Sequence, residues 1–272
     1  MRLISRGALR SAEAVNALRG LINKALLFVN SFVAVILTPE EIASYTKQVY
    51  EDKELSPYGD REWIEKGLNP SERDVIEKHA GRSGSFLVLG CGGGREAIAL
   101  AKMGFDVTGI DASEKLILKA KEHIAREAVK VAVSKDDFLE MSFPKGGFDH
   151  CLLALFMYSA VPSRAMRVAL LAKINDALTD RGVAIIHFAT THGDRSERLF
   201  KLRKAVARIV KGNIAYQTGD SFDPPSHFSH RFLDEHEVID EVREAGLSVK
   251  EIIADHHIPD GTYAILEKIR RQ

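Results

Sequence analysis

Short apolar runs alternate with amphipathic stretches over most of the chain after residue 85. Apolar positions that recur every three or four residues predict helices in the amphipathic stretches, at about 113–127, 163–178 and 234–245. Alternating strands and helices are typical of an α/β fold whose doubly wound, mostly parallel sheet carries helices on both faces. The apolar runs predict a seven-stranded sheet, with strands at 86–89, 107–110, 129–133, 148–155, 183–188, 247–254 and 262–269.

Residues 1–80 lack such alternation and are predicted to be helical. Thr38-Pro39-Glu40-Glu41 and Asn69-Pro70-Ser71-Glu72 each combine an N-cap residue, a proline at the first helical position and a capping-box glutamate. We therefore divide the chain into an N-terminal helical cap or lid, 1–80, and a second domain, 81–272, with an insertion at 190–231. The insertion holds a basic helix and a polar loop that contains Asp223-Pro224-Pro225.

The N-terminus is basic and then apolar. Arginines dominate the first twenty residues, and the apolar stretch 21–37 is interrupted by polar side chains, which makes it too short and broken for a membrane span. No signal-peptide cleavage site follows it. The pattern favours helices that pack on the domain or cover its site. Interfacial membrane contact through 1–37 and a true anchor are the alternatives. We therefore expect a cytoplasmic protein, with a membrane-peripheral location as the second expectation.

The amino-acid composition excludes few classes of binding partner. Lys+Arg and Asp+Glu both number 38, so net charge gives no argument for nucleic acid. Three interpretations of the basic helix 195–211 are open. A solvated helix face comes first, a contact with anionic lipid second and an RNA contact third, since no interleaving of aromatic with basic residues supports stacking on bases. Cys91 and Cys151 have neither metal nor redox spacing and are predicted to be buried, reduced thiols. The sequence does not indicate an oligomeric state.

The stretch 86–111 organises the rest of the chain. An apolar run leads into a glycine-dense turn, a helix to about Met103 and a second apolar run that ends at Asp111. Successive glycines let the backbone approach a ligand, and free amides at a helix N-terminus favour an anionic group. Asp111 follows Gly90 at the spacing of about 20 residues typical of acids that bind ribose hydroxyls. A plain turn with Asp111 as a helix cap is the alternative, but the complete order favours a Rossmann-like nucleotide site.

The details of the turn favour one kind of nucleotide ligand. Dinucleotide sites place a glycine or alanine where this chain has Arg95, which would crowd a pyrophosphate. The pattern Gly90-x-Gly92-x-Gly94 instead resembles motif I of the class I S-adenosylmethionine-dependent methyltransferases. Four further segments resemble motifs of that family in register: 109–113, Asp137-Phe138-Leu139, 148–153 and Leu178-Thr179-Asp180-Arg181-Gly182.

The resemblance implies S-adenosyl-L-methionine as cofactor. In the family the strand-two acid, here Asp111, binds the ribose; Asp137 would meet the adenine amino group, and the next residue would pack on the ring. The family often has an acid two residues before the first glycine, and Val88 occupies that position. The implied cofactor-binding residues are Gly90, Cys91, Gly92, Gly94, Asp111, Ala112, Asp137, Phe138 and Leu155.

The acceptor is predicted to be a small molecule methylated at oxygen or nitrogen by in-line displacement. Such a reaction mainly needs positioning and exclusion of water, so no Ser/His/Asp set is expected. His187, at a strand end, is the candidate general base, although a structural histidine is the commoner case. Tyr158, His227 and His230 are candidates for contact with the acceptor. His227 and His230 lack a third ligand, so we predict no metal.

Two other functions remain open from the sequence. A non-catalytic module of the same fold would associate with RNA or lipid without turnover. An NAD-dependent oxidoreductase would use the same βαβ unit, and Arg95 argues against it.

Overall fold

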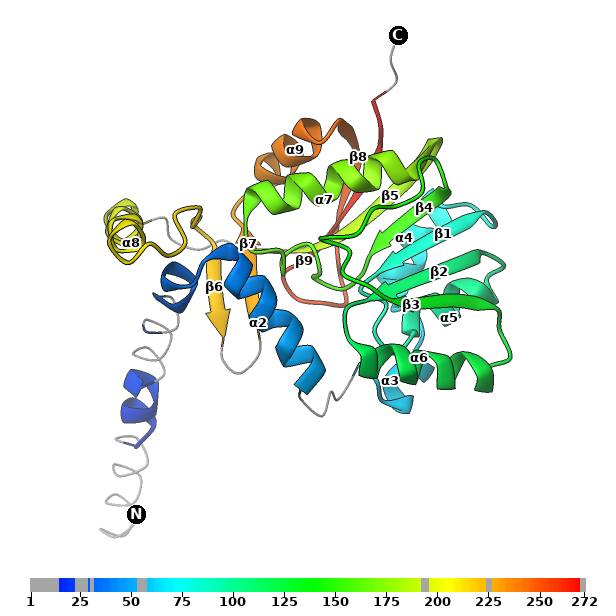
Figure 1. The fold of residues 1–272 in the computed structure, drawn as a ribbon, viewed down its shortest axis with the longest axis horizontal. Coiled ribbons are helices and arrows are strands. Elements are labelled where there is room, and N and C mark those ends of the chain that lie inside the picture. Colours follow the sequence, from blue (N-terminus) through cyan, green and yellow to red (C-terminus); the bar gives the residue numbers. More distant parts are fainter. Residues whose placement is uncertain are drawn as a thin grey trace, which may run out of the picture.

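One nine-stranded sheet runs through the part of the chain that the computed structural model describes, residues 15–22, 29, 32–52, 58–191, 196–223 and 227–269 (Figure 1). The strand order is β3-β2-β1-β4-β5-β7-β6, and β9 pairs with both β5 and β8. The strands are β1 (Ser85–Leu89), β2 (Asp106–Asp111), β3 (Val131–Lys135), β4 (Phe148–Leu153), β5 (Leu178–Thr190), β6 (Asp220–Asp223), β7 (His227–Phe232), β8 (Leu247–Ala254) and β9 (Gly261–Lys268).

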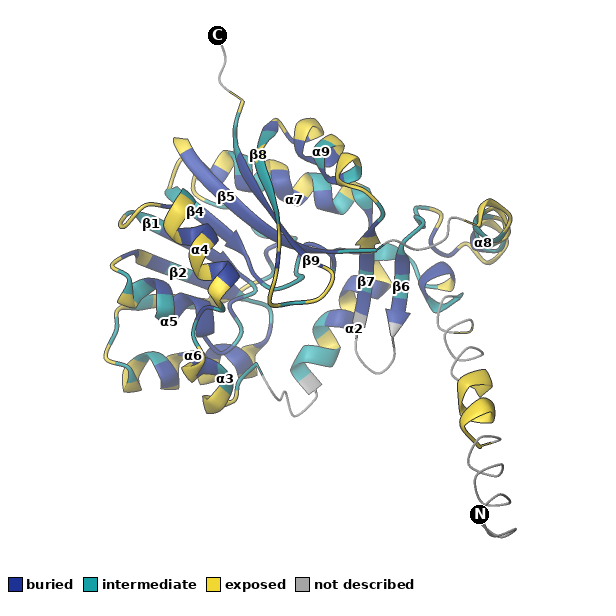
Figure 2. Cartoon of the chain, turned by 180° about the vertical axis from the view of Figure 1, so that it is seen from behind, coloured by how far each residue is buried: buried dark blue, intermediate teal, exposed yellow. Residues whose placement is uncertain are grey.

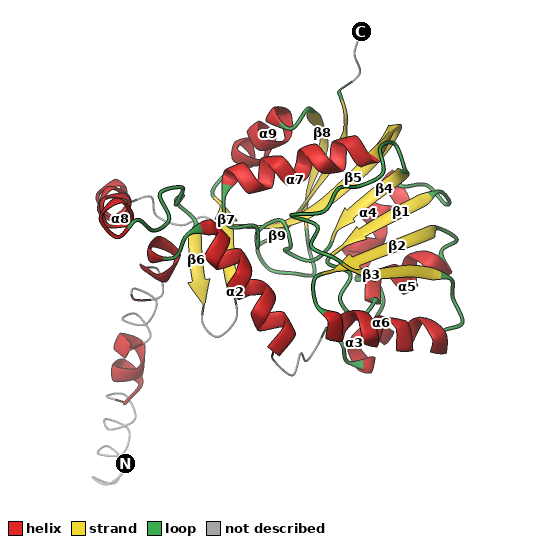
Figure 3. Cartoon of the chain, in the orientation of Figure 1, coloured by secondary structure: helices red, strands yellow, loops and turns green. Residues whose placement is uncertain are grey.

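The core of the sheet is parallel, as predicted. β1 pairs in parallel with β2 and β4, β2 with β3, and β4 with β5, whereas β9 runs antiparallel between β5 and β8. The α/β, Rossmann-like fold is therefore confirmed, and each of the seven predicted apolar runs forms a strand. Helices cover both faces (Figure 3). They are α2 (Pro39–Asp52), α3 (Arg61–Glu65), α4 (Pro70–His79), α5 (Arg95–Lys102), α6 (Glu114–Arg126), α7 (Arg164–Ala177), α8 (Glu197–Val210) and α9 (Glu235–Glu244).

β1 shows how the sequence builds two cores. Side chains alternate across a strand, so Leu87 and Leu89 join one buried cluster, which contains residues of α7 and α9. Phe86 and Val88 join a second cluster, which contains residues of α4 and α5. All four are fully buried, and Figure 2 shows the buried strands between these helices. A continuous apolar run is what a strand covered on both faces requires.

The polar loop predicted within 190–231 is partly wrong, because this region forms the hairpin β6–β7. β7 follows a period of two, with Phe228, His230 and Phe232 all fully buried. It also adds to the end of β5, pairing Ala189 with Arg231 in parallel. The interruption of the apolar positions by a histidine conceals this strand in the sequence. Residues 224–226, which include both prolines, lie outside the described residues.

The N-terminal segment packs on the insertion. Ala34, Val35 and Ile42 form a third buried cluster, together with Ala207 of α8, Tyr216, and Phe222 and Phe228 of the hairpin. The Asn213 side chain donates to the carbonyl of Ala34. The domain boundary at residue 80 stays a prediction. Of the N-terminal residues predicted to contact a membrane, 1–14, 23–28, 30 and 31 lie outside the described part. Among the residues that are described, no helix is long and apolar enough to cross a membrane.

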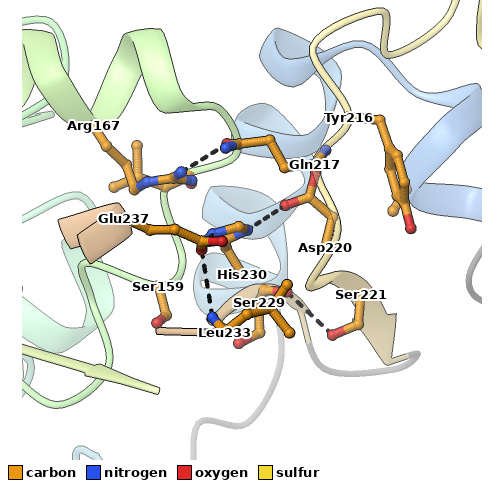
Figure 4. A network of polar contacts seen from close by, with 12 residues as sticks. Ser159, Arg167, Tyr216, Gln217, Asp220, Ser221, Ser229, His230, Leu233 and Glu237 are labelled. Atoms are coloured by element: carbon orange, nitrogen blue, oxygen red, sulfur yellow. Dashed lines mark hydrogen bonds and ion pairs between the residues drawn. The ribbon is translucent and has the colours of Figure 1, made fainter. Parts of the chain in front are cut away.

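A buried ion pair joins α7 to α9, and its arginine also contacts the insertion. Arg167 of α7 and Glu241 of α9 lie 2.7 Å apart, with side chains 0% and 2% exposed. Arg167 also donates to the Gln217 side chain, as Figure 4 shows. Arg164 and Glu244 pair on the same two helices but remain 40% and 54% exposed. The two pairs therefore differ mainly in burial.

We predict that Arg167→Ala lowers the free energy of unfolding by about 3–5 kcal/mol, because it leaves the Glu241 carboxylate buried without its partner. Arg164→Ala, the matched control, should cost no more than about 1 kcal/mol, since an exposed pair contributes little. Urea unfolding followed by circular dichroism measures both changes. Equal losses in the two variants would contradict the assigned role of burial.

Candidate active site

A cavity lies at the carboxyl ends of β1, β2 and β4, and α2 forms part of its wall. It encloses about 1000 Å³ of empty space, including its open mouth. Ligands of open α/β sheets bind at this edge of the strands. The lining residues are Ala43, Thr46, Lys47, Tyr50, Tyr58, Trp63, Gly90, Cys91, Gly92, Arg95, Glu96, Asp111, Ala112, Leu116, Asp137, Phe138, Leu139, Ala154, Leu155, Met157, Ala160, Val161 and Pro162.

The glycine turn between β1 and α5 forms the floor of the cavity. Gly90, Gly92 and Gly94 have φ angles of 73°, 51° and 96°, which residues with a Cβ rarely adopt. Gly93 donates to the carbonyl of Tyr58, and a Cβ at Gly93 would lie 2.6 Å from that oxygen. The missing side chain therefore lets the segment at Tyr58 pack directly on the turn.

Asp111 joins the end of β2 to the glycine turn. Its two carboxylate oxygens accept from the backbone N–H groups of Gly92 and Ser113, each at 2.9 Å. Burial raises the pKa of Asp111, and these two hydrogen bonds oppose the shift. Each oxygen can accept a further hydrogen bond, and the residue lines the cavity. The carboxylate is thus held ready for hydroxyl donors.

Asp137 holds α2 over the cavity. Its Oδ2 lies 2.6 Å from Nζ of Lys47, and its Oδ1 accepts from the backbone N–H of Leu139. Phe138, only 6% exposed, presents its ring beside it in the cavity wall. No pattern in the sequence indicated Lys47, which lies ninety residues away in the chain.

Arg95 supports the turn from beneath. Its guanidinium lies 3.0 Å from Glu72 and 2.5 Å from Glu96, and it stacks over the Trp63 ring at 5.2 Å. Both acids and the arginine are at most 5% exposed. Arg95 therefore ties α4 and α5 together and fixes the aromatic ring that borders the cavity.

Comparison with known proteins identifies the family. A family model described as a methyltransferase domain matches residues 86–182, from β1 into β5. The chain belongs to the class I S-adenosylmethionine-dependent methyltransferases. It is similar to a ubiquinone biosynthesis O-methyltransferase of Acinetobacter baylyi, with 28% identity over 71% of this chain and 76% of the relative.

Solved structures show the same fold. A 1,6-didemethyltoxoflavin-N1-methyltransferase of Burkholderia thailandensis, crystallised with S-adenosylhomocysteine, has a TM-score of 0.62 at 16% identity and covers 86% of this chain and 91% of its own. A methyltransferase of Methanosarcina mazei has a TM-score of 0.57 at 19% identity, covering 75% of this chain and all of its own. These likenesses show the fold; together with the methyltransferase-domain match at residues 86–182, the cofactor of this enzyme is S-adenosylmethionine.

The methyltransferase brings nearly all its predicted cofactor-binding residues to the cavity. Gly90, Cys91, Gly92, Asp111, Ala112, Asp137, Phe138 and Leu155 line it. Gly94 lies behind the turn, where it caps α5. Cys91 and Cys151 are both free and buried, and burial raises the pKa of each thiol. Contact of the predicted cofactor-binding residues with the cofactor itself stays a prediction.

The acceptor residues predicted from sequence lie elsewhere. Tyr158 is fully buried, and its hydroxyl donates to Glu241. His230 is fully buried beside Asp220, 2.7 Å away (Figure 4). Neither lines the cavity, so the structure argues against acceptor contact by either one. β7 begins at His227, whose side chain lies outside the described part.

His187 is positioned as a structural residue rather than as a base. It is 1% exposed, its Nδ1 accepts from the backbone N–H of Phe156, and its Nε2 lies 3.4 Å from Asp255. Burial would raise the pKa of Asp255, but hydrogen bonds from His187 and His257 hold it well below its usual range. Both ring nitrogens face protein atoms, and His187 does not line the cavity, so its role as a general base stays a prediction.

The part of the cavity wall that the sequence analysis did not predict comes from the segment before the sheet. Tyr50 and Tyr58 lie with ring centroids 6.1 Å apart, and Tyr58 meets Trp63 edge-on at 5.8 Å. Trp63, the single tryptophan of the chain, was the available signal. Among the described residues, no three His, Cys, Asp or Glu side chains are grouped so that they could hold a metal ion.

We predict that Asp111→Ala weakens binding of S-adenosylhomocysteine by about 1–3 kcal/mol, because ribose hydroxyls would lose their acceptor. Isothermal titration calorimetry measures the affinity. Asp106→Ala, at the exposed start of the same strand, is the control and should bind like the unmodified protein. Unchanged affinity in Asp111→Ala would make this acid a helix cap only.

A second prediction concerns pH. Burial, with the like charge of Glu96, raises the pKa of Glu72 from 4.5 to about 7, although Arg95 opposes the shift. The folded protein therefore holds this proton more tightly than the unfolded chain, and that stabilisation disappears as pH rises through about 7.

Glu72→Gln keeps a neutral capping-box partner for Asn69 at every pH. We compare the melting temperature of Glu72→Gln with that of the unmodified protein at each pH. The difference, variant minus unmodified protein, should increase between about pH 5 and about pH 8. Thermal unfolding at matched ionic strength measures the difference. Glu77→Gln, an exposed change on the same helix, should show no such trend; a flat difference for Glu72→Gln would refute the raised pKa.

Proposed function

We propose that this methyltransferase methylates an oxygen atom of a small, largely apolar, ring-containing acceptor. The observation that carries the proposal is the continuity of one cavity. The glycine turn, Asp111 and Asp137 border one region of it. Apolar and aromatic side chains border most of the rest, together with the polar side chains of Thr46, Lys47, Arg95 and Glu96. Sites of this kind combine apolar walls with a few polar groups that fix orientation.

The residues present fit S-adenosylmethionine. The turn after β1 has no side chain at Gly92 that would fill the cradle, and Asp111 has lone pairs available for vicinal hydroxyls. Asp137 and Phe138 would receive the adenine. Lys47 would then release the Asp137 carboxylate or share it with the adenine. When bound, the cofactor supplies a methyl group on a positively charged sulfur, already activated for in-line displacement by the acceptor oxygen.

The acceptor wall favours an apolar ring. Met157, Ala160, Val161 and Pro162 follow β4, and Ala43 faces the cavity from α2. The rings of Tyr50, Tyr58 and Trp63 offer edge and face contacts to an aromatic acceptor. Relatives named ubiquinone biosynthesis O-methyltransferase support oxygen as the acceptor atom. Nitrogen remains the second candidate.

The chain's own contribution is positioning. α2 and Trp63 border the cavity and reduce its exposure to water, and the buried ion pairs beneath keep the turn rigid. Since His187 faces the interior, an acidic hydroxyl such as a phenol, which gives up its proton easily, suits this site better than an aliphatic alcohol.

The test is turnover of S-adenosylmethionine with matched acceptors: alkyl-substituted phenols, the corresponding anilines and charged, polyhydroxylated compounds. We expect S-adenosylhomocysteine and the methyl ether from the apolar phenols. Transfer of the methyl group only to the anilines would make nitrogen, and not oxygen, the acceptor atom. Binding of S-adenosylhomocysteine without turnover on any class would refute the proposed acceptor while leaving the cofactor in place.

The same assay tests the acceptor wall. Ala43→Phe should lower kcat/KM by about tenfold or more, because the ring fills space that the acceptor needs, while affinity for S-adenosylhomocysteine stays close to that of the unmodified enzyme. Ser44→Phe places the same ring on the exposed side of α2 and is the control. Equal loss of cofactor affinity in Ala43→Phe would place this residue at the cofactor instead.

A further inference from the structure

The end of the molecule that carries α8 exposes an unusual set of large apolar side chains. Figure 1 shows α8 projecting at this end, next to the N-terminal segment and away from the sheet. Isolated exposed apolar residues are ordinary, but a gathered set marks an interaction site. The set, which we call the α8 patch, consists of Ile36 (50% exposed), Leu202 (52%), Ile209 (81%), Val210 (47%) and Ile214 (67%).

Backbone contacts bring the two parts of the α8 patch together. Asn213 donates from its backbone to Val35 and from its side chain to Ala34. A Cβ at Gly212 would lie 2.3 Å from the carbonyl oxygen of Ile36, so only glycine allows this approach. Ile36 and Ile214 therefore lie on either side of a tight, buried junction. The patch is a built feature of the fold and not a frayed end.

Basic side chains surround the α8 patch. Lys201 and Arg208 are spaced seven residues apart, as are the neighbouring Leu202 and Ile209, so both pairs lie along one side of the helix. Arg198 and Lys211 are exposed at its two ends. The acid on this surface, Glu197, pairs with Lys201. Arg203 and Lys204 turn inward, toward Tyr216 and the carbonyl of Ile214.

The described N-terminal helix, residues 15–22, has the same character. Val15, Leu18, Leu21 and Ile22 are 50–65% exposed. Arg19 is its charged residue, and the helix contains no acid. It lies on the same side of the molecule as α8 in both Figure 1 and Figure 2.

We propose that the α8 patch and the helix 15–22 dock on an anionic membrane surface. The apolar side chains would enter the interface between headgroups and acyl chains, and the lysines and arginines would meet the lipid phosphates. Charge complementarity favours this partner, because a second copy of the chain would bring two basic surfaces together. The exposed face of α8 has no aromatic side chain for stacking on RNA bases. The proposal does not depend on which acceptor the enzyme uses.

The experiment is co-sedimentation of the full chain with phosphatidylcholine vesicles, with or without phosphatidylglycerol. We expect binding to the anionic vesicles, weaker binding to the neutral ones, and a decrease with added salt. The variant Arg208→Glu with Ile209→Glu should reduce the partition coefficient by about tenfold or more, because it removes one basic and one apolar contact and adds two negative charges.

The matched control carries the same changes on α6, Leu118→Glu with Lys121→Glu. Leu118 is 51% exposed, and Lys121 is exposed beside it, so this variant should bind vesicles like the unmodified protein. Thermal unfolding confirms that both variants fold, and the salt dependence of the unmodified protein gives a second measurement.

Three results would overturn the proposal. These are absence of vesicle binding, equal loss of binding in the two variants, and a concentration-dependent dimer in analytical ultracentrifugation that only the α8 variant abolishes. The last would assign the patch to a second copy of the chain.

Discussion

The site depends on the hydrogen bonds that the Asp111 carboxylate accepts. The carboxylate accepts from Gly92 and Ser113 at once, so one side chain fixes the turn after β1, the end of β2 and the start of α6. The carbonyl of Ile110 accepts from the N–H groups of Gly90 and Cys91 and pulls the turn toward the same strand end. A ligand that also bonds to Asp111 therefore meets a group that is already oriented, and it does not have to order the turn.

The half of the cavity that faces this carboxylate is built from sequence far away. Gly93 donates to the backbone carbonyl of Tyr58 at close range, Arg95 fixes Trp63, and Asp137 holds Lys47. These three contacts connect the turn and the third strand end to the helices before the sheet. Each contact uses a residue at or beside a predicted cofactor-binding position, so the contacts that hold this wall lie where the cofactor is expected to bind.

This arrangement explains what the sequence could predict. The glycine turn, Asp111 and Asp137 belong to strand–turn–helix patterns that are local in sequence, and the structure brings them to one cavity. Lys47, Tyr50 and Trp63 reach that cavity only through tertiary packing, so no residue spacing in the sequence predicts them.

His187, Tyr158 and His230 lie outside the cavity lining for a related reason. The residues after β4 form turns instead of continuing the strand, so strand alternation does not decide which of their side chains face the cavity. β4 ends at Leu153 rather than residue 155; Leu155 and Met157 then line the cavity while Tyr158 enters the core and bonds to Glu241. His230 follows the buried face of a strand that its polar neighbours concealed.

α2 lies between the cavity and the α8 end of the molecule. Ile42 belongs to the buried cluster shared with α8 and the β6–β7 hairpin, whereas the adjacent Ala43 faces the cavity. Tyr45 of the same helix packs on Phe222 of the hairpin, with ring centroids 5.3 Å apart. Displacement of α8 or of the hairpin would therefore act on α2 directly, and through Lys47 on Asp137. A helix packed on both sides in this way makes the geometry of the cavity sensitive to whatever holds the α8 end of the molecule.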